Sequence, residues 1–303
     1  MKVDVRGALK EHGFSGRVVS TAHLPELEQE IAERRLLMDH ELFNAYMRGL
    51  VFDPPDDLPQ AQSIIVVAMP DPWTAIRFGW HGQAVPLVVP PTYLQARRKD
   101  ERARHILEEH LAPAGYGVAD AILPKKLLAT RSGLATYGRN NISYVPGMGS
   151  FHRLAAFYSD LPGTEEQWIE PRLLPLCVKC RACERACPTG AISGERFLLY
   201  AERCLTFHNE KDSAVPLPEW LDPAAHRWLV GCMHCQEVCP QDRPFLGRLE
   251  EGLSFSEEET TQLLDGMPIE ALPASTVEKL QDAGLDTVQD ALARNLALLL
   301  EGL

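Results

Sequence analysis

The order of apolar and polar positions predicts helices at both ends of this chain and buried strands between them. Residues 1–50 are expected to be mostly helical, because Leu27, Ile31 and Leu36 recur at helical spacing among charged side chains. Several prolines then break this pattern. A short apolar run follows at 63–69, and such a run is typical of a strand that is buried on both faces.

Proline, glycine and charge mark the limits of the next elements. Residues 70–95 are rich in proline and aromatic side chains, so this segment is expected to be irregular. A charged amphipathic helix is predicted over 97–111, and a second helix over 124–131 with a proline in its first turn. Strands are predicted at 142–145 and 153–158, separated by a hairpin-like turn that contains glycine and proline.

Residues 254–303 return to a helical pattern. Ser256 and Glu259 have the spacing of a capping box, in which each side chain accepts a hydrogen bond from the other residue's backbone N–H. Apolar residues at helical spacing define the buried face of the final helix: Val288, Ala291, Leu292, Leu296, Leu299 and Leu300.

Composition and charge narrow the class of protein. The chain has 303 residues, of which 45% are hydrophobic, so it can form two or three domains with real cores. Its net charge of −12 disfavours a nucleic-acid partner, because a polyanion is repelled. The first residues show no export signal, and no apolar run approaches the roughly 20 residues of a membrane span. We expect a cytoplasmic protein that does not enter a membrane.

Cysteine spacing gives the strongest chemical signal. The first four of the eight cysteines, followed by a proline, have the spacing of bacterial ferredoxins, in which three thiolates bind one 4Fe–4S cluster and the fourth crosses to a second. The later run supplies three cysteines, and Cys204 completes the set. One cluster is expected on Cys177, Cys180, Cys183 and Cys239, and the other on Cys187, Cys204, Cys232 and Cys235.

Three other uses of these cysteines compete with the clusters. Disulfides are typical of exported chains, and two cysteines with only two residues between them do not easily form a disulfide with each other. Zinc does not explain a third cysteine at the same spacing or the proline after each run. Structural buried thiols rarely cluster in this way. Among the histidines, His152 and His208 are expected to be hydrogen-bonded, and His234 to contact the surroundings of a cluster without ligating it.

Seven short segments carry a resemblance to a known family. They are 187–192, 203–205 and 231–240 around the cysteines, 132–134, 138–140 and 149–151 before them, and 294–295 near the end. They resemble the epoxyqueuosine reductase family, which couples two 4Fe–4S clusters to a cobalamin and is related to reductive dehalogenases. Ala135 and Arg139 stand where that family has glycine and lysine. The helical repeats with which some members grip tRNA are not recognisable in this sequence.

The resemblance implies a corrinoid pocket in the front of the chain. Asp120 lies near the family's proton-donating carboxylate, and Tyr137 and Arg139 lie in the pocket-like segment, so these three are the candidate catalytic residues. Cofactor contacts are expected from Tyr93, Gly133, Gly138, Asn140, Gly149 and Ser150. Ordinary structural roles compete: a core aromatic for Tyr137, a surface salt bridge for Arg139, and a helix cap for Asp120.

Together these patterns predict an α+β protein in three segments. We expect an α/β corrinoid-binding-like domain at 1–170, a bacterial ferredoxin-like domain with two clusters at 171–245, and a short helical tail at 246–303. The expected function is that of an oxidoreductase, fed by an external donor of ferredoxin or flavodoxin type, that passes electrons through the clusters to cobalamin and an unknown small molecule. The alternatives are an electron-transfer or reductive-activating protein that serves the cofactor of a partner redox protein, and a cluster-bearing scaffold without turnover.

Overall fold

The chain forms a mixed α+β structure that divides into two compact units. The computed structural model describes residues 3–163 and 167–300. The first unit comprises Met1–Pro70, Arg97–Arg181 and Gly194–Leu198, and the second comprises Asp71–Ala96, Ala182–Ser193 and Leu199–Leu303. These units do not follow the limits 1–170, 171–245 and 246–303, which stay a prediction. The boundary between Arg181 and Ala182 falls inside the first cysteine run.

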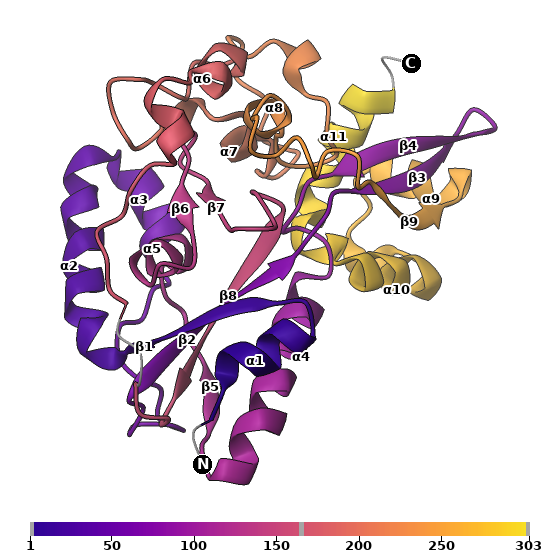
Figure 1. The fold of residues 1–303 in the computed structure, drawn as a ribbon. Helices are drawn as coiled ribbons and strands as arrows, with labels where there is room; N and C mark the ends of the chain where they lie inside the picture. The colour runs from indigo at the N-terminus through magenta and orange to yellow at the C-terminus, as the bar shows by residue number, and fades with distance from the viewer. Residues whose placement is uncertain (1–2, 164–166, 301–303) are drawn as a thin grey trace. The chain divides into compact units, whose positions relative to one another are not determined.

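A four-stranded antiparallel sheet is the centre of the first unit (Figure 1). Its strand order is β1-β2-β8-β5. The strands are β1 (Ser15–Ser20), β2 (Ser63–Pro70), β8 (His152–Ser159) and β5 (Val118–Asp120). The predicted apolar strand is confirmed as β2, in which every residue but Pro70 is buried. Its position inside the sheet explains the continuous apolar run, because both of its faces are covered.

Helices cover both faces of this sheet. Ile64, Val66 and Ala68 share one core with helices α2 and α5, whereas Ile65, Val67 and Met69 share another with α1 and α4. The alternation follows from the period of two in a strand. The bounds of these helices, and of the neighbouring α3, are α1 (Val5–Glu11), α2 (Leu24–Arg34), α3 (His40–Met47), α4 (Ala96–Leu111) and α5 (Lys125–Arg131).

Two predictions for the first unit need correction. The expected helical stretch 1–50 also contains strand β1, which pairs with β2 along its whole length. The predicted strand at 142–145 is shortened to β7 (Ser143–Tyr144), and it pairs with β6 (Thr136–Tyr137) in a separate two-stranded sheet. The hairpin-like turn predicted before β8 is present, since Val145 and Gly149 form an isolated antiparallel bridge, but β8 itself pairs only with β2 and β5 among the described strands.

The second unit contains a three-stranded sheet that the sequence pattern missed. The segment 70–95, expected to be irregular, forms a hairpin of β3 (Thr74–Trp80) and β4 (Gln83–Val89). A third strand, β9 (Glu250–Phe255), pairs with β3 in parallel. The prolines that suggested an irregular segment, Pro70, Pro90 and Pro91, lie outside these two strands, and Pro86 is tolerated within β4 because β4 is an edge strand.

Helices near the end of the chain pack on this sheet. The helical prediction for 254–303 is confirmed between 257 and 300 by α9 (Glu257–Leu264), α10 (Ala274–Ala283) and α11 (Gln289–Leu300), whereas residues 254–255 belong to β9 and residues 301–303 lie outside the described part of the chain. Ser256 and Glu259 form the expected capping box. The predicted apolar face of α11 packs into a core with Ile76 and Phe78 of β3.

Three short helices lie among the cysteines: α6 (Ala182–Ala186), α7 (Leu205–Asn209) and α8 (His234–Glu237). Within residues 3–163 and 167–300, no helix has both the length and the apolar character to cross a membrane.

Candidate functional site

All eight cysteines are free thiols, and all are half-buried. Half-burial lets a cluster be bound at a loop while its sulfur atoms remain shielded from bulk water. No three His, Cys, Asp or Glu side chains of the described residues converge on one ion. Cys177 and Cys180 belong to the first unit and the other six cysteines to the second. The donor set fits two 4Fe–4S clusters in number and chemistry, and the assignment of each thiol to a cluster rests on spacing.

The first cysteine loop is shaped by turns of its own backbone. Residues Pro175–Val178 form a 3₁₀ turn, which begins with a proline. The backbone N–H of Cys177 donates to the carbonyl of Leu174 (2.8 Å), and the N–H of Cys180 donates to that of Leu176 (3.2 Å). These bonds consume backbone donors along the loop and fix the direction in which it turns.

Arg139 holds this loop from outside. Its Nη2 donates to the carbonyl oxygen of Cys177 (2.6 Å) and its Nε donates to that of Cys180 (3.1 Å). Neither the expected surface salt bridge nor a side chain free to face a substrate describes this geometry. A planar guanidinium reaches two carbonyl oxygens at once, which a single ammonium group does less well.

The backbone of Tyr137 makes a second tie to the same loop. Its N–H donates to the carbonyl of Arg172 (3.0 Å), and its carbonyl accepts from the N–H of Leu174 (2.8 Å). Tyr137 and Leu173 thereby form a parallel bridge. The segment that resembles the family's pocket is therefore bound directly to the segment that carries Cys177 and Cys180.

The remaining residues of that segment pack mainly against one another. Asn140 is buried and donates from Nδ2 to the hydroxyl of Tyr144 (3.0 Å). A Cβ at Gly138 would collide with Asn140 and with the ring of Tyr144. Gly133 has a positive φ of 70°, and a Cβ there would lie 3.3 Å from Gln167 Oε1. Internal packing and backbone conformation therefore explain why glycine is needed at these two positions.

Gly149 and Ser150 end a tight turn before β8. Gly149 has a φ of 60°, and Val145 and Gly149 form an isolated bridge. His152 donates from Nδ1 to the carbonyl of Gly149 (3.0 Å), so its Nε2 accepts from the hydroxyl of Ser143 (3.1 Å). Burial lowers the pKa of His152 to about 4, and the imidazole is neutral at physiological pH. This histidine is hydrogen-bonded, as predicted.

Asp120 does not cap the following helix. Its side chain is 69% exposed and pairs with Arg104 at 3.3 Å. The N-cap of α5 is Pro124, with no side-chain cap. The cap expected for Asp120 is therefore wrong, because the carboxylate points toward α4.

A cavity of about 550 Å³ lies in the first unit and includes Tyr137 among its lining residues. The ring of Tyr137 meets Phe197 edge to face, with centroids 4.9 Å apart. Burial raises the pKa of Tyr137, so its hydroxyl stays protonated at neutral pH. None of the other predicted pocket residues lines this cavity.

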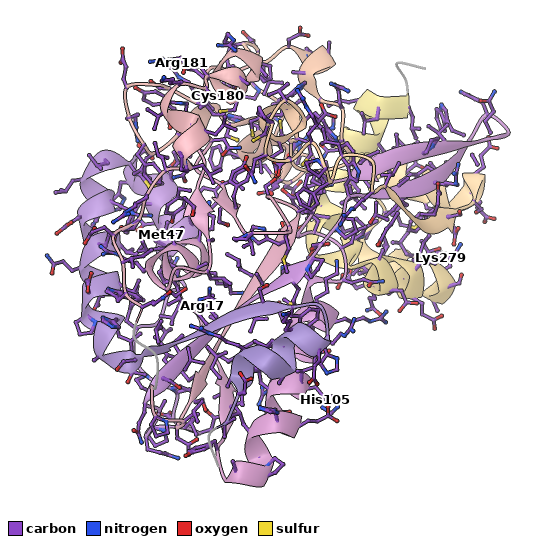
Figure 2. All side chains as sticks on the ribbon, viewed as in Figure 1. Arg17, Met47, His105, Cys180, Arg181 and Lys279 are labelled. Carbon is purple, nitrogen blue, oxygen red and sulfur yellow. The ribbon has the colours of Figure 1, made fainter. Side chains whose placement is uncertain are left out.

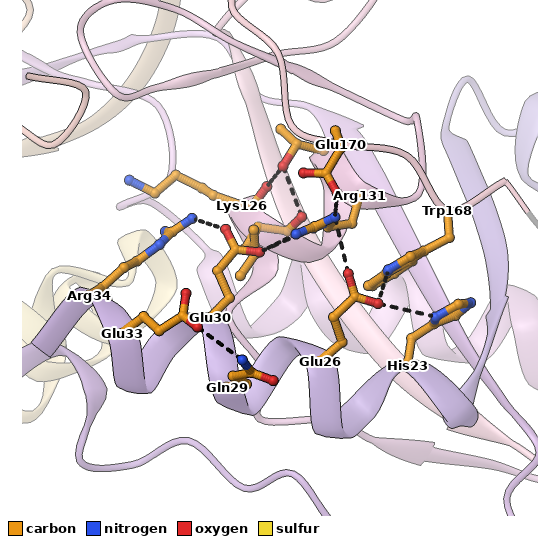
Figure 3. Close-up of polar contacts among 12 residues, drawn as sticks. His23, Glu26, Gln29, Glu30, Glu33, Arg34, Lys126, Arg131, Trp168 and Glu170 are labelled. Atoms are coloured by element: carbon orange, nitrogen blue, oxygen red, sulfur yellow. Dashed lines mark hydrogen bonds and ion pairs between the residues drawn. The ribbon is translucent and has the colours of Figure 1, made fainter.

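A buried arginine, Arg131, forms an ion-pair network at the side of the cavity (Figure 3). It contacts Glu26 (3.1 Å), Glu30 (2.8 Å) and Glu170 (2.9 Å), and Arg34 pairs with Glu30 at 2.7 Å. Three carboxylates around one guanidinium compensate its desolvation. Sequence reasoning placed Arg131 only at the end of a helix, and no spacing signal relates it to α2.

Tyr93 belongs to the second unit, where it contacts the second cysteine run. Its hydroxyl donates to Glu210, whose pKa is raised by burial. A Cβ at Gly231, the residue before Cys232, would collide with the Tyr93 ring. Glu210 was not foreseen, because nothing in the local sequence distinguishes it from a surface carboxylate.

Helix α11 ties together the segments that carry Cys204 and Cys232. Asn295 is fully buried and donates from Nδ2 to the carbonyls of Asn209 (2.8 Å) and Leu229 (2.9 Å). Asn209 in turn exchanges two hydrogen bonds with the backbone of Gly231. Arg294 donates to four carbonyls at the end of α7 and in the loop that follows it: those of Asn209, Lys211, Asp212 and Val215.

Burial and hydrogen bonding also define the surroundings of the second cysteine run. Burial raises the pKa of the Cys204 thiol, and raises that of Cys232 to about 12. His234 Nε2 donates to the carbonyl of Ala225 (2.9 Å), and its ring meets Trp228 edge to face at 4.8 Å. His208 likewise donates to a carbonyl, that of Glu202.

Comparison with known proteins agrees with these features. A family model described as "4Fe-4S double cluster binding domain" matches residues 176–242. The epoxyqueuosine reductase of Synechococcus sp. (strain CC9605) is 31% identical over 250 residues, which are 76% of this chain and 72% of that protein. The solved epoxyqueuosine reductases of Streptococcus thermophilus and Bacillus subtilis share the fold, with TM-scores of 0.65 and 0.67 and identities of 16% and 21%. Each comparison covers 97% of this chain and 79% of the solved chain.

Proposed function

Because the chain belongs to the epoxyqueuosine reductase family, we propose that it is a reductase whose clusters supply electrons singly to a corrinoid and a small-molecule substrate other than tRNA. The chain is an iron–sulfur oxidoreductase of this family with a domain for two 4Fe–4S clusters. The corrinoid and the substrate are the proposed part.

The observation that carries the proposal is the pair of ties between the pocket-like segment and the first cysteine loop. Arg139 and the backbone of Tyr137 connect residues 132–140 to residues 172–180 through hydrogen bonds no longer than 3.1 Å. An electron carrier alone does not need such a segment beside its ligand loop. In a reductase, the same ties keep the entry of electrons in a fixed geometry relative to the pocket.

Tyr137 is the best candidate for a proton donor among the three proposed catalytic residues. Its phenol is buried and lines the cavity, and the raised pKa keeps the proton on the hydroxyl. Asp120 is mostly exposed and paired with Arg104. Arg139 acts on the loop and is assigned a positioning role.

The residues proposed to hold a corrinoid fit it in part. Gly147, in the same turn as the proposed contact Gly149, has a positive φ of 81° and open space where a Cβ would lie, so a flat ring can approach the backbone there. At Gly133 and Gly138 the space that a Cβ would occupy is bordered by other side chains of this chain. When bound, a corrinoid supplies a cobalt centre for one-electron chemistry. We derive no step through it.

The choice of a substrate other than tRNA rests on charge. At a net charge of −12 the chain lacks the general positive field that phosphate contacts require. A gel-shift titration with tRNA at physiological ionic strength tests this point. Tight binding that weakens steeply with salt would contradict it.

Titration of cob(II)alamin into anaerobic protein tests the corrinoid. We expect the electron paramagnetic resonance spectrum to lose the coupling to the lower axial nitrogen, as the cobalamin enters a pocket in its base-off form. A cobalt assay beside an iron assay on protein purified without oxygen gives an independent answer. An unchanged spectrum of free cobalamin at saturating protein would contradict the proposal.

One observation favours the alternative of an electron-transfer protein that serves a partner's cofactor. Leu176 and Val178, on either side of Cys177, are 45% and 71% exposed, which suits a docking surface more than a closed pocket. A failed cobalamin titration, together with fully reducible clusters, would make this alternative the better account.

A further inference from the structure

Exposed aliphatic side chains gather in the loop that carries Cys177. Leu173 is 37% exposed, Leu176 45% and Val178 71%, all within six residues. Single exposed aliphatic residues are common on proteins and carry no message. Three of them lie within one short loop beside a predicted cluster ligand, and exposed apolar residues that occur together mark interaction sites.

The loop presents these side chains from a fixed backbone. The bridge to Tyr137 holds Leu173, the 3₁₀ turn holds Leu176 and Val178, and Arg139 binds the carbonyls on either side of Lys179. All of these contacts lie inside the first unit. A preorganised surface loses less conformational entropy when a partner binds.

Cationic residues are interspersed with the exposed aliphatic residues along the loop, and Arg172 and Leu173 also line the cavity that includes Glu30, Glu33 and Glu170. Arg172 and Lys179 are exposed, and residues 171–181 contain three cationic residues but no carboxylate (Figure 2 labels Cys180 and Arg181 in this segment). The preceding Glu170 is ion-paired with Arg131. This local excess stands in a chain of net charge −12. We name the exposed side chains of Arg172, Leu173, Leu176, Val178 and Lys179 the cationic loop face.

We propose that the cationic loop face docks an acidic one-electron carrier protein, which delivers electrons to the cluster held in part by Cys177 and Cys180. The inference rests on the proposed function, since it needs a reducible cluster at these thiols. Each productive encounter moves one electron: the reduced carrier is oxidised by one electron and the cluster is reduced by one. A flavodoxin hydroquinone, which is an anion at neutral pH, becomes the neutral semiquinone by losing this one electron, and no proton is transferred.

The chemistry of the face favours a protein over a nucleic acid. Single-stranded nucleic acids are bound by aromatic side chains that stack on bases, together with a continuous basic groove. The cationic loop face has aliphatic side chains and no aromatic one. Apolar contacts in the centre and charges at the rim are the usual arrangement of a transient protein interface.

The test compares two reductants on the anaerobic, cluster-loaded protein. The probes are an acidic bacterial flavodoxin in its hydroquinone form and reduced methyl viologen, a small cation that needs no docking surface. The variant is the double charge reversal Arg172→Glu with Lys179→Glu. We expect the rate of cluster reduction by flavodoxin to fall by about tenfold at low salt, because steering by charge is lost. Reduction by the viologen should not slow, since the new carboxylates attract a cation.

Matched variants separate docking from a general effect of charge or polarity. Lys10→Glu changes an exposed lysine of α1, and Ile122→Asp changes an aliphatic side chain that is 58% exposed. Val178→Asp changes one of similar exposure in the cationic loop face. We expect only Val178→Asp to slow the flavodoxin reaction.

Ionic strength gives a readout that needs no variant. The wild-type rate with flavodoxin should fall as salt rises, and this dependence should be weaker in the double variant. A wild-type rate that ignores salt, or a double variant as fast as the wild type with flavodoxin, would overturn the proposal. The proposal would also be overturned if tRNA competed with flavodoxin for binding to the wild type but did not compete for binding to the double variant.

Failure of the proposed function has a different signature. If reduced viologen cannot reduce the clusters of the wild-type protein, the proposed function fails. The docking proposal is then tested by comparing the affinity of flavodoxin for the wild type with its affinity for the double variant. If the double variant binds too little iron to be assayed, the docking proposal is tested by Val178→Asp and by the salt dependence of the wild-type rate. Equal binding of flavodoxin to wild type and Val178→Asp would then overturn the inference.

Discussion

The Nη2 atom of Arg139 lies 2.6 Å from the carbonyl oxygen of Cys177 and donates a hydrogen bond to it. This contact joins a residue of the pocket-like segment to a residue that is predicted to ligate iron. Because the bond is to the main chain, it controls the shape of the loop and leaves the thiol available. The side chain is therefore a clamp on the cluster loop.

Removing this clamp should weaken one cluster selectively. Arg139→Gln loses charge-assisted hydrogen bonds, each worth about 1.5–3 kcal/mol in a folded protein. We expect iron of the cluster on Cys177 and Cys180 to be lost to a chelator about tenfold faster, which corresponds to about 1.4 kcal/mol. Arg139→Lys should lose less, because an ammonium still reaches one carbonyl.

Chelator kinetics with electron paramagnetic resonance checks this expectation. Arg172→Gln is the control in the same loop, since its exposed guanidinium plays no part in the clamp. Equal loss of both clusters, or an Arg139→Gln variant that keeps iron as well as the control, would contradict the clamp.

The buried side chain of Asn295 should protect the other cluster. Asn295→Ala leaves the carbonyl of Leu229 without this donor and the carbonyl of Asn209 with the Arg294 donor alone, at a cost of about 1–3 kcal/mol. The hydrogen bonds that this variant loses hold the segments next to Cys204 and Cys232. We expect a lower melting temperature and faster loss of half the iron. Asn295→Asp, which turns a carboxylate toward the same carbonyls, should be worse, and equal stability of the two variants would argue against the contact.

The sequence predicted the fold wherever one local pattern determined it. The strand at 63–69, the helix at 97–111 and the capping box at Ser256 followed from periodicity and spacing, and the structure confirms them. The hairpin of β3 and β4 was missed because its segment is rich in proline and aromatic residues, and only the folded chain shows that Pro70, Pro90 and Pro91 lie outside both strands.

The candidate site likewise has features that the sequence predicted and features that it did not. Spacing alone pointed to a domain for two 4Fe–4S clusters, which the family match to residues 176–242 confirms, whereas the division of the thiols between the clusters stays a prediction. The clamp of Arg139, the network of Arg131 and the pairing of Tyr93 with Glu210 join residues between 38 and 117 positions apart. No periodicity records such contacts, so they could be found only in the folded chain.

The isolated Cys204 should be needed for only one cluster. It lies at the N-cap of α7, away in sequence from the two cysteine runs. Wild-type protein reconstituted without oxygen should hold about eight irons and eight sulfides, and Cys204→Ala should keep about four irons. Cys204→Ser, with an oxygen ligand, should lose less. Two intact, interacting 4Fe–4S signals in the alanine variant would show that the assignment of Cys204 is wrong.

The buried imidazole of His152 should make stability depend on pH. Its pKa is about 4 in the folded chain and about 6.5 when exposed, so only the unfolded chain gains a proton as pH falls between these values. The stabilisation present above pH 6.5 is therefore lost progressively down to about pH 4. From pH 7 to pH 5 the loss is about 2 kcal/mol.

Denaturation of wild type and His152→Asn across this range checks the effect. Asparagine can still donate to the carbonyl of Gly149 but does not titrate, so the variant should lack this part of the slope. Parallel curves for the two proteins would mean that His152 is not the source.

Gly138 and Gly147 distinguish internal packing from the approach of a cofactor. Gly138→Ala should lower the free energy of unfolding by about 1–3 kcal/mol, because the methyl group meets Asn140 and Tyr144. Gly147→Ala meets nothing within 4 Å, so its cost is the left-handed backbone alone, about 1–2 kcal/mol. If a corrinoid covers this turn, Gly147→Ala should weaken cob(II)alamin binding more than its loss of stability explains. Gly138→Ala should bind cob(II)alamin normally at temperatures where it remains folded. The reverse order of affinities would place the ring over Gly138 and would mean that the packing of Asn140 and Tyr144 changes when the cofactor binds.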